Sequence, residues 1–303
     1  MPRRAFKYAS LGAAAALSLA ASRAGAQACC AGASAITPGR LALHEDALVG
    51  LQLRGAQLVG SFDPRGRYRP SASGSAETEL RQDVFAAVRF LHRAQLAVLV
   101  PFVETRRSVA GQSDLGGGLG DINVGLRYDA LLARALPGIA LLAGVTLPTG
   151  VPVESADNPL ATDATGIGAV QAHAGLALEQ LAGAWTFSGT ALIAQRLARD
   201  VQGLEERLGT QGTFILAAAY ASESELALAA SAAYAIEGNA TIDNVEQRDT
   251  SRALFTATAS AAYPLSDSVR VQGALFLTPP LSSLGANQSA SAGLSFTVIY
   301  AWL

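Results

Sequence analysis

The chain has 303 residues, a formal net charge of −2 and 15% charged residues, which excludes the clustered basic face of a nucleic-acid-binding protein. Hydrophobic residues make up 50% of the chain, yet the part that follows the N-terminus has no run of 18 apolar residues that would predict a transmembrane helix. The length fits two ordinary domains or one large barrel.

The N-terminus has the three parts of a secretory signal. Residues 3–7 are rich in basic side chains, residues 11–21 are apolar, and residues 24–26 (Ala-Gly-Ala) form a small-residue cleavage site. The apolar part is too short to span a bilayer. We therefore expect residues 1–26 to be a signal peptide and the mature chain to start at Gln27.

Residues 27–47 are rich in Ala, Gly and Ser and show little periodicity. We expect this segment to lie in the periplasm or to pack into the interior of the fold described below. It holds the only two cysteines, Cys29 and Cys30, and adjacent cysteines rarely bridge each other without strain. We interpret them as an exposed pair, with a lipid anchor on Cys29 as an alternative. His44 alone adds too few ligands for a metal site.

Apolar residues recur at every second position through most of the remaining chain, which is the signature of β-strands. In residues 119–132, for example, Val124 and Leu126 alternate with Asn123 and Arg127. The pattern predicts twelve strands, at residues 48–61, 78–91, 94–105, 119–132, 138–148, 167–180, 184–197, 211–221, 224–237, 251–263, 268–278 and 290–302.

The predicted connections alternate between short turns and long polar loops. The long ones lie at 62–77, 106–118, 149–166, 198–210 and 238–250. Short periplasmic turns and long extracellular loops are typical of transmembrane β-barrels, and an even strand count places both termini on the short-turn side. Seven aromatic residues close to the short turns predict a periplasmic girdle: Phe90, Tyr128, Trp185, Tyr220, Tyr263, Tyr300 and Trp302.

The predicted fold class is therefore all-β, an antiparallel transmembrane β-barrel of about 12 strands over residues 48–303, located in the outer membrane. An Ala-rich helical protein is one alternative, because alanine favours helices. The 30 glycines and the period of two argue against it. A soluble β-sandwich is the other alternative, but its outer face should be polar, whereas here the polar face is the narrower one.

Polar residues of the strands share the parity that faces the lumen, and they carry charges of both signs. We expect a narrow, mixed-charge constriction that selects solutes, formed by Asp83, Asp121, Arg127 and His173. The alternative is that these residues form an ion-pair network that only stabilises the barrel, since inward polar residues are expected of any such protein.

Catalysis is a further alternative, because some outer-membrane barrels are hydrolases. The sequence offers His173, with Ser188 or Thr190 on the next strand, as a Ser–His type pair. A local catalytic motif, metal-ligand spacing and a phosphate or dinucleotide fingerprint are all missing. We predict no catalytic residues, no metal and no cofactor.

Two short motifs resemble those of a known family. Residues 118–121 (Gly-Leu-Gly-Asp), with Tyr128 seven residues after the aspartate, precede a hairpin that ends in residues 147–150 (Leu-Pro-Thr-Gly). This order resembles the outer-membrane "transporter" family named after the meta-pathway of phenol degradation, from about Leu115 to the C-terminus. The resemblance implies an outer-membrane barrel associated with uptake of aromatic or hydrophobic compounds, and it brings no catalytic residues.

The expected function is that of a passive channel for small solutes, hydrophobic or aromatic compounds among them; a structural barrel without transport is the alternative. Expected partners are outer-membrane lipids, the barrel-assembly machinery and a small solute of unknown identity, with no nucleic acid. Assembly signals usually end in an aromatic residue, whereas this chain ends Trp302-Leu303, which weakens the signal without removing it.

Overall fold

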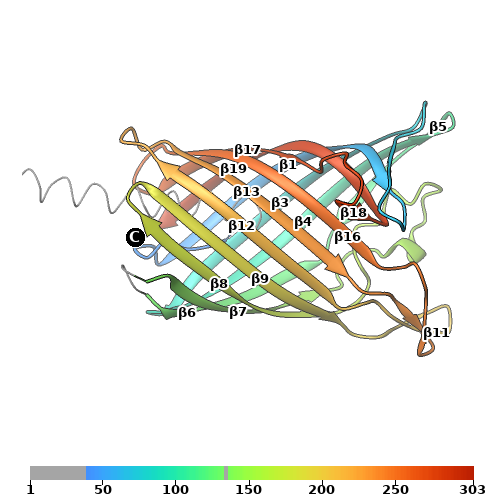
Figure 1. Cartoon of the computed structure of the whole chain (residues 1–303), viewed down its shortest axis with the longest axis horizontal. Helices are drawn as coiled ribbons and strands as arrows, with labels where there is room; N and C mark the ends of the chain where they lie inside the picture. Colours follow the sequence, from blue (N-terminus) through green and yellow to red (C-terminus); the bar gives the residue numbers. More distant parts are fainter. Residues whose placement is uncertain (1–38, 133–135) are drawn as a thin grey trace, which may run out of the picture.

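The computed structural model describes residues 39–132 and 136–303. The predicted signal peptide, Cys29 and Cys30 lie outside these residues. In the described chain, twelve antiparallel strands close into a barrel, and the strands are steeply tilted relative to the barrel axis (Figure 1). The all-β class and the expected strand count are confirmed.

Each barrel strand pairs with the barrel strand before it in the chain, and the first pairs with the last, so that Ala47 lies opposite Trp302. The wall consists of β1 (Ala47–Phe62), β3 (Ala76–Leu91), β4 (Ala94–Val109), β6 (Ile122–Leu131), β7 (Gly138–Leu147), β8 (Gln171–Ala182), β9 (Trp185–Arg196), β12 (Gln211–Ala221), β13 (Ala227–Glu237), β16 (Arg252–Pro264), β17 (Val269–Leu277) and β19 (Gln288–Trp302).

Short elements decorate the end of the barrel opposite the C-terminus (Figure 1). They are β2 (Tyr68–Pro70), β5 (Gln112–Leu119), the 3-10 helix η1 (Val153–Ser155), β10 (Arg199–Val201), β11 (Leu204–Arg207), β14 (Thr241–Ile242), β15 (Val245–Glu246) and β18 (Gly285–Ala286). β10, β11, β14 and β15 form a separate four-stranded sheet. Over the described residues, no helix has the length and apolar character needed to cross a bilayer.

Four of the five predicted long loops contain short strands, and the most extensive pairing lies in residues 106–118. Residues 106–118 form a hairpin in which β4 continues to Val109, turns at Ala110–Gly111 and returns as β5. Both turn residues have positive φ, 50° and 86°. The polar composition that suggested a loop reflects a hairpin that projects beyond the membrane, where both faces of a strand meet water.

Side-chain exposure follows the predicted parity. In β3, Val84 and Val88 are 43% and 46% exposed on the outer face, while Asp83 and Phe85 on the inner face are 4% and 1% exposed. A strand must alternate in this way when one face meets lipid and the other meets a lumen. The outer face is therefore the apolar one, as a membrane requires.

Aromatic residues mark two levels on the outer face. At the end near the C-terminus, the ring centroids of Trp185 and Tyr220 lie 5.2 Å apart and those of Tyr300 and Trp302 lie 4.8 Å apart. Toward the loop end, Phe214, Tyr234 and Phe255 stand opposite one another on three adjacent strands. Such belts form where a barrel wall meets the two membrane interfaces.

Candidate functional site

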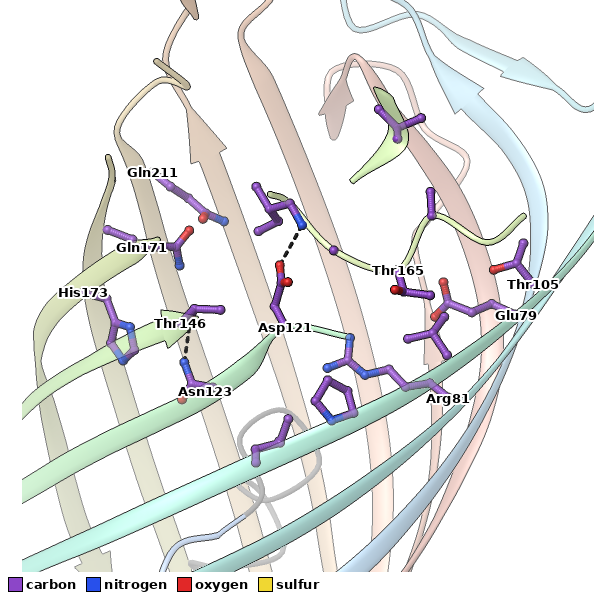
Figure 2. Close-up of a pocket in the computed structure, with 18 of the residues that line it drawn as sticks. Glu79, Arg81, Thr105, Asp121, Asn123, Thr146, Thr165, Gln171, His173 and Gln211 are labelled. Atoms are coloured by element: carbon purple, nitrogen blue, oxygen red, sulfur yellow. Dashed lines mark hydrogen bonds between the residues drawn. The ribbon is translucent and has the colours of Figure 1, made fainter. Parts of the chain in front are cut away.

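A cavity of about 690 Å³ lies in the lumen. Its walls come from β3, β4, β6, β7, β8, β9 and β12, together with the loop 148–170 between β7 and β8 (Figure 2). Several lining residues stand at the loop-side ends of their strands, among them Thr146, Gln171 and Gln211. The cavity therefore occupies the half of the barrel nearest the long loops.

Two motifs noted in the sequence meet at this cavity. The Thr149 hydroxyl donates to the Gly120 carbonyl at 2.6 Å and accepts from the Ile122 amide at 3.1 Å. Asp121 accepts the Gly150 amide at 3.0 Å on Oδ1 and the Ile167 amide at 2.6 Å on Oδ2. The Gly-Leu-Gly-Asp and Leu-Pro-Thr-Gly runs thus form one hydrogen-bonded junction that holds both ends of the loop 148–170.

Close backbone contact explains the glycines of this junction. A Cβ on Gly150 would lie 2.7 Å from the Cα of Gly166, and a Cβ on Gly166 would lie 2.4 Å from Asp121 Oδ1. The Thr165 hydroxyl donates to the Leu119 carbonyl at 2.7 Å, which draws the loop against the inside of the wall. Thr165 and Asp121, both labelled in Figure 2, line the cavity where the loop meets the wall.

The four residues expected to form a constriction do not converge. Asp121 and His173 line the cavity, whereas Asp83 and Arg127 do not. Asp83 accepts a 2.7 Å bond from the cavity-lining Arg81, so it acts on the cavity through that guanidinium. Arg127 lies six residues along from Asp121, which corresponds to about 20 Å in an extended strand.

Arg127 belongs instead to an ion-pair network near the opposite end of the barrel. It pairs with Asp129 at 2.8 Å and with Glu179 at 3.0 Å, and Glu179 also pairs with Arg40. Arg40 is part of the segment 39–46, which precedes β1. This network therefore ties the N-terminal segment to the inner faces of β6 and β8.

The segment 39–46 makes further contacts with inward-facing side chains. The Leu41 amide donates to Gln95 Oε1 at 3.1 Å, and the Leu41 side chain, 4% exposed, packs in a buried cluster with Phe85. Arg89 donates to the Ala42 carbonyl at 2.6 Å, and Glu45 pairs with Arg270. These contacts reach β3, β4 and β17, so the segment fills the end of the lumen away from the long loops.

The two sides of the cavity differ in chemistry. On β3 and β4, charged groups occur in pairs, with Arg107 bound to Glu77 at 2.7 Å and Arg81 bound to Asp83. On β8, β9 and β12 the lining residues include no Asp, Glu, Lys or Arg, and the polar ones are His173, Gln171, Gln211 and Thr213. Inward parity had pointed to His173, and no sequence signal pointed to the convergence of the amides of Gln171 and Gln211.

Sequence reasoning also missed an apolar stripe on the inner face of β4. Ala97, Leu99, Pro101 and Val103 all line the cavity. The segment 96–103 is apolar on both faces, so the alternation that marks inward positions elsewhere is lost there. An uninterrupted apolar run within a barrel strand was the available signal.

The proposed Ser–His type pair does not form. In the register of β8 with β9, His173 lies opposite Ala194, whereas Thr190 lies opposite Ala177 and Ser188 opposite Glu179. Thr190 is therefore displaced by four residues, about 13 Å, and Ser188 by more. In the ranges that the structure covers, no cluster of three His, Cys, Asp or Glu residues could hold a metal ion.

Comparison with known proteins gives a family and an architecture. The family described as MetA-pathway of phenol degradation matches residues 77–302. An outer-membrane channel from Pseudomonas putida F1 has a similar structure, with a TM-score of 0.71 and 14% identity over 86% of this chain and 97% of that one.

Other solved barrels are less similar. The NanC porin has a TM-score of 0.47 and 9% identity over 84% of this chain and 100% of its own. The translocator domain of the autotransporter NalP from Neisseria meningitidis has a TM-score of 0.47 and 10% identity over 94% of this chain and 97% of its own. No curated protein matches the chain.

Proposed function

Because this outer-membrane β-barrel belongs to the family described as MetA-pathway of phenol degradation, we propose that it is a passive channel for small solutes. The description of the family makes hydrophobic and aromatic compounds the first solutes to test. Small solutes would diffuse through the lumen of the barrel, without a catalytic step and without a cofactor.

The observation that carries the proposal is the cavity in the lumen. Its volume, about 690 Å³, falls in the range of small-molecule sites. A barrel whose inward side chains served only to brace the wall would fill this space with paired groups. Here the loop 148–170 is held against one side of the wall by Asp121 and Thr149, and the space beside it stays open.

Passage to the other side requires movement of the segment 39–46. Ion pairs of Glu45 with Arg270 and of Arg40 with Glu179 hold this segment among inward-facing side chains. Low-dielectric walls strengthen such pairs relative to water. We therefore expect a small conductance with long closed periods, since the segment must shift for each opening.

The test is single-channel recording of the refolded mature protein in planar bilayers. Glu45→Gln weakens the pair with Arg270, so the open fraction should rise; Glu223→Gln removes one carboxylate from an exposed turn and should leave it unchanged. Absence of conductance at every voltage in the wild type and in Glu45→Gln would contradict the channel proposal.

A structural barrel without transport is the second candidate. The observation that favours it is the same network around Arg127, Glu179 and Arg40, which closes one end of the lumen with paired charges. Under that proposal Glu45→Gln should lower the free energy of unfolding and produce no current. The recordings therefore separate the two candidates, and unfolding measurements on the same protein check that the change has weakened the ion pair.

A further inference from the structure

We propose that the lumen cavity is a binding site for small uncharged organic solutes that present an apolar face and an acceptor oxygen. This inference rests on the proposed function, since such a site would lie on the path of a permeating solute. In this site the apolar stripe of β4 contacts the apolar face of the solute. The side-chain amides on β8 and β12 donate hydrogen bonds to its oxygen.

The apolar face of the site belongs to the stripe Ala97, Leu99, Pro101 and Val103. Pro101 is fully buried, whereas Ala97, Leu99 and Val103 are partly exposed, and Ala97 and Leu99 also pack against the cluster of Leu41 and Phe85. Four consecutive inward positions extend over about 20 Å of strand. Leu192 of β9 also lines the cavity. Inward residues of a barrel that only conducted water and ions would be polar at these positions. The exposed parts of Ala97, Leu99 and Val103 favour a solute that removes them from water.

The hydrogen-bonding side of the site is organised by Arg196. Its guanidinium donates to Gln171 Oε1 at 2.9 Å and to Gln211 Oε1 at 3.1 Å. Both amide oxygens are thereby engaged, and each side chain retains its NH₂ group as a donor. Gln171 and Gln211 both line the cavity, on the same side of it in Figure 2. Two donors held in place in this way match an acceptor oxygen such as a hydroxyl, ether or carbonyl.

The charges around the site favour an uncharged solute. Arg196 is 7% exposed and forms an ion pair with Glu237 at 2.7 Å, so the group that positions the donors adds little net charge. Arg81 and Arg107 are likewise paired with carboxylates. The carboxylate of Glu79, a further lining residue, adds negative charge to the opposite wall. Among the described residues that line the cavity, both arginines, Arg81 and Arg107, are paired with carboxylates, so an anion would meet this negative charge without an unpaired lining arginine to bind.

The test uses protein in lipid nanodiscs, with empty nanodiscs subtracted, and equilibrium dialysis of two probes that share one ring. Benzyl alcohol is neutral and benzoate is an anion. We expect benzyl alcohol to bind at least about tenfold more tightly. Leu99→Asn on one wall and Gln211→Leu on the other should each weaken its binding about fivefold, the worth of one such contact.

Gln52→Leu is the matched control. Gln52 is an inward amide, 4% exposed, that binds Thr297 Oγ1 at 3.0 Å and does not line the cavity, so this change should leave benzyl alcohol binding unaltered. Equal binding of the two probes, or unchanged binding in both wall variants, would overturn the inference. Dialysis needs no ion current, so a protein that binds benzyl alcohol without conducting would disprove the channel and keep the site.

Discussion

An arginine placed at Val124 should destabilise the barrel far more than an arginine at its neighbour Asn123. On the outer face, Tyr128 belongs to the aromatic level near the short turns. Phe102 is the exposed aromatic residue nearer the loops, and Leu119 lies opposite it on the neighbouring strand. Leu119 and Tyr128 are nine residues apart. At a rise of about 3.4 Å per residue and a tilt of about 40°, they span about 23 Å, close to the apolar band of such barrels.

Val124 stands near the middle of that band, four residues from Tyr128. Arginine on the lipid face at the midplane costs about 2–4 kcal/mol. Asn123 lines the cavity, and its replacement by arginine loses the 2.9 Å hydrogen bond to Thr146 Oγ1, which corresponds to about 1 kcal/mol. The new guanidinium stays in contact with water in the lumen.

Reversible unfolding by guanidinium in phospholipid vesicles measures both changes, with Val124→Leu as the control for altered packing at the lipid face. The expected order of stability is wild type, Asn123→Arg and then Val124→Arg, with the last two separated by at least about 1 kcal/mol. Equal losses at the two positions would refute the assignment of the inner and outer faces.

Three further predictions concern the loops. An epitope inserted at Gly111, the tip of the β4–β5 hairpin, should be reachable by antibody on intact cells, whereas one at Glu223 should not; the reverse result would invert the topology. Asp121→Ala should release the loop 148–170, seen as faster proteolysis of that loop and altered ion selectivity, whereas unchanged proteolysis would argue against its anchoring role. Backbone amides, first that of Asp157, lower the pKa of Asp163 below its usual 3.8. Its contribution to loop order is therefore complete above about pH 3.8 and is lost as the pH falls through the lowered pKa. Amide exchange in the loop should accelerate over that range, and Asp163→Asn should abolish the dependence.

The fold could be predicted from local pattern because membrane and lumen impose opposite demands on adjacent residues. In residues 122–128, the alternation of Val124 and Leu126 with Asn123 and Arg127 was sufficient to give both the strand and its faces. Where both faces meet water, as in residues 106–118, the same reasoning mistook a hairpin for a loop. Where both are apolar, as along 96–103, it could not identify the inner face.

The candidate site could be predicted only in part. Parity correctly placed Asp121 and His173 in the lumen, but parity says nothing about the level of a residue along the barrel axis. Arg127 shares the inward parity and yet lies about 20 Å along the strand from Asp121. The expected constriction combined Asp83, Asp121, Arg127 and His173 because all four face the lumen. In the structure Asp121 and His173 line the cavity, whereas Arg127 belongs to the ion-pair network near the other end of the barrel.

The sequence by itself determined the twelve strands of the barrel wall, the two faces of those strands that alternate, and the end of the barrel that carries the long loops, because each depends on residues close together in the chain. Only the tertiary structure decided that the Thr149 hydroxyl donates a hydrogen bond to the Gly120 carbonyl and that the loop 148–170 lies against the inside of the wall. It also decided that Arg196 donates hydrogen bonds to both Gln171 and Gln211. These contacts join residues 15 to 46 positions apart. They depend on the register between strands, in which a shift of one residue exchanges the inner and outer faces.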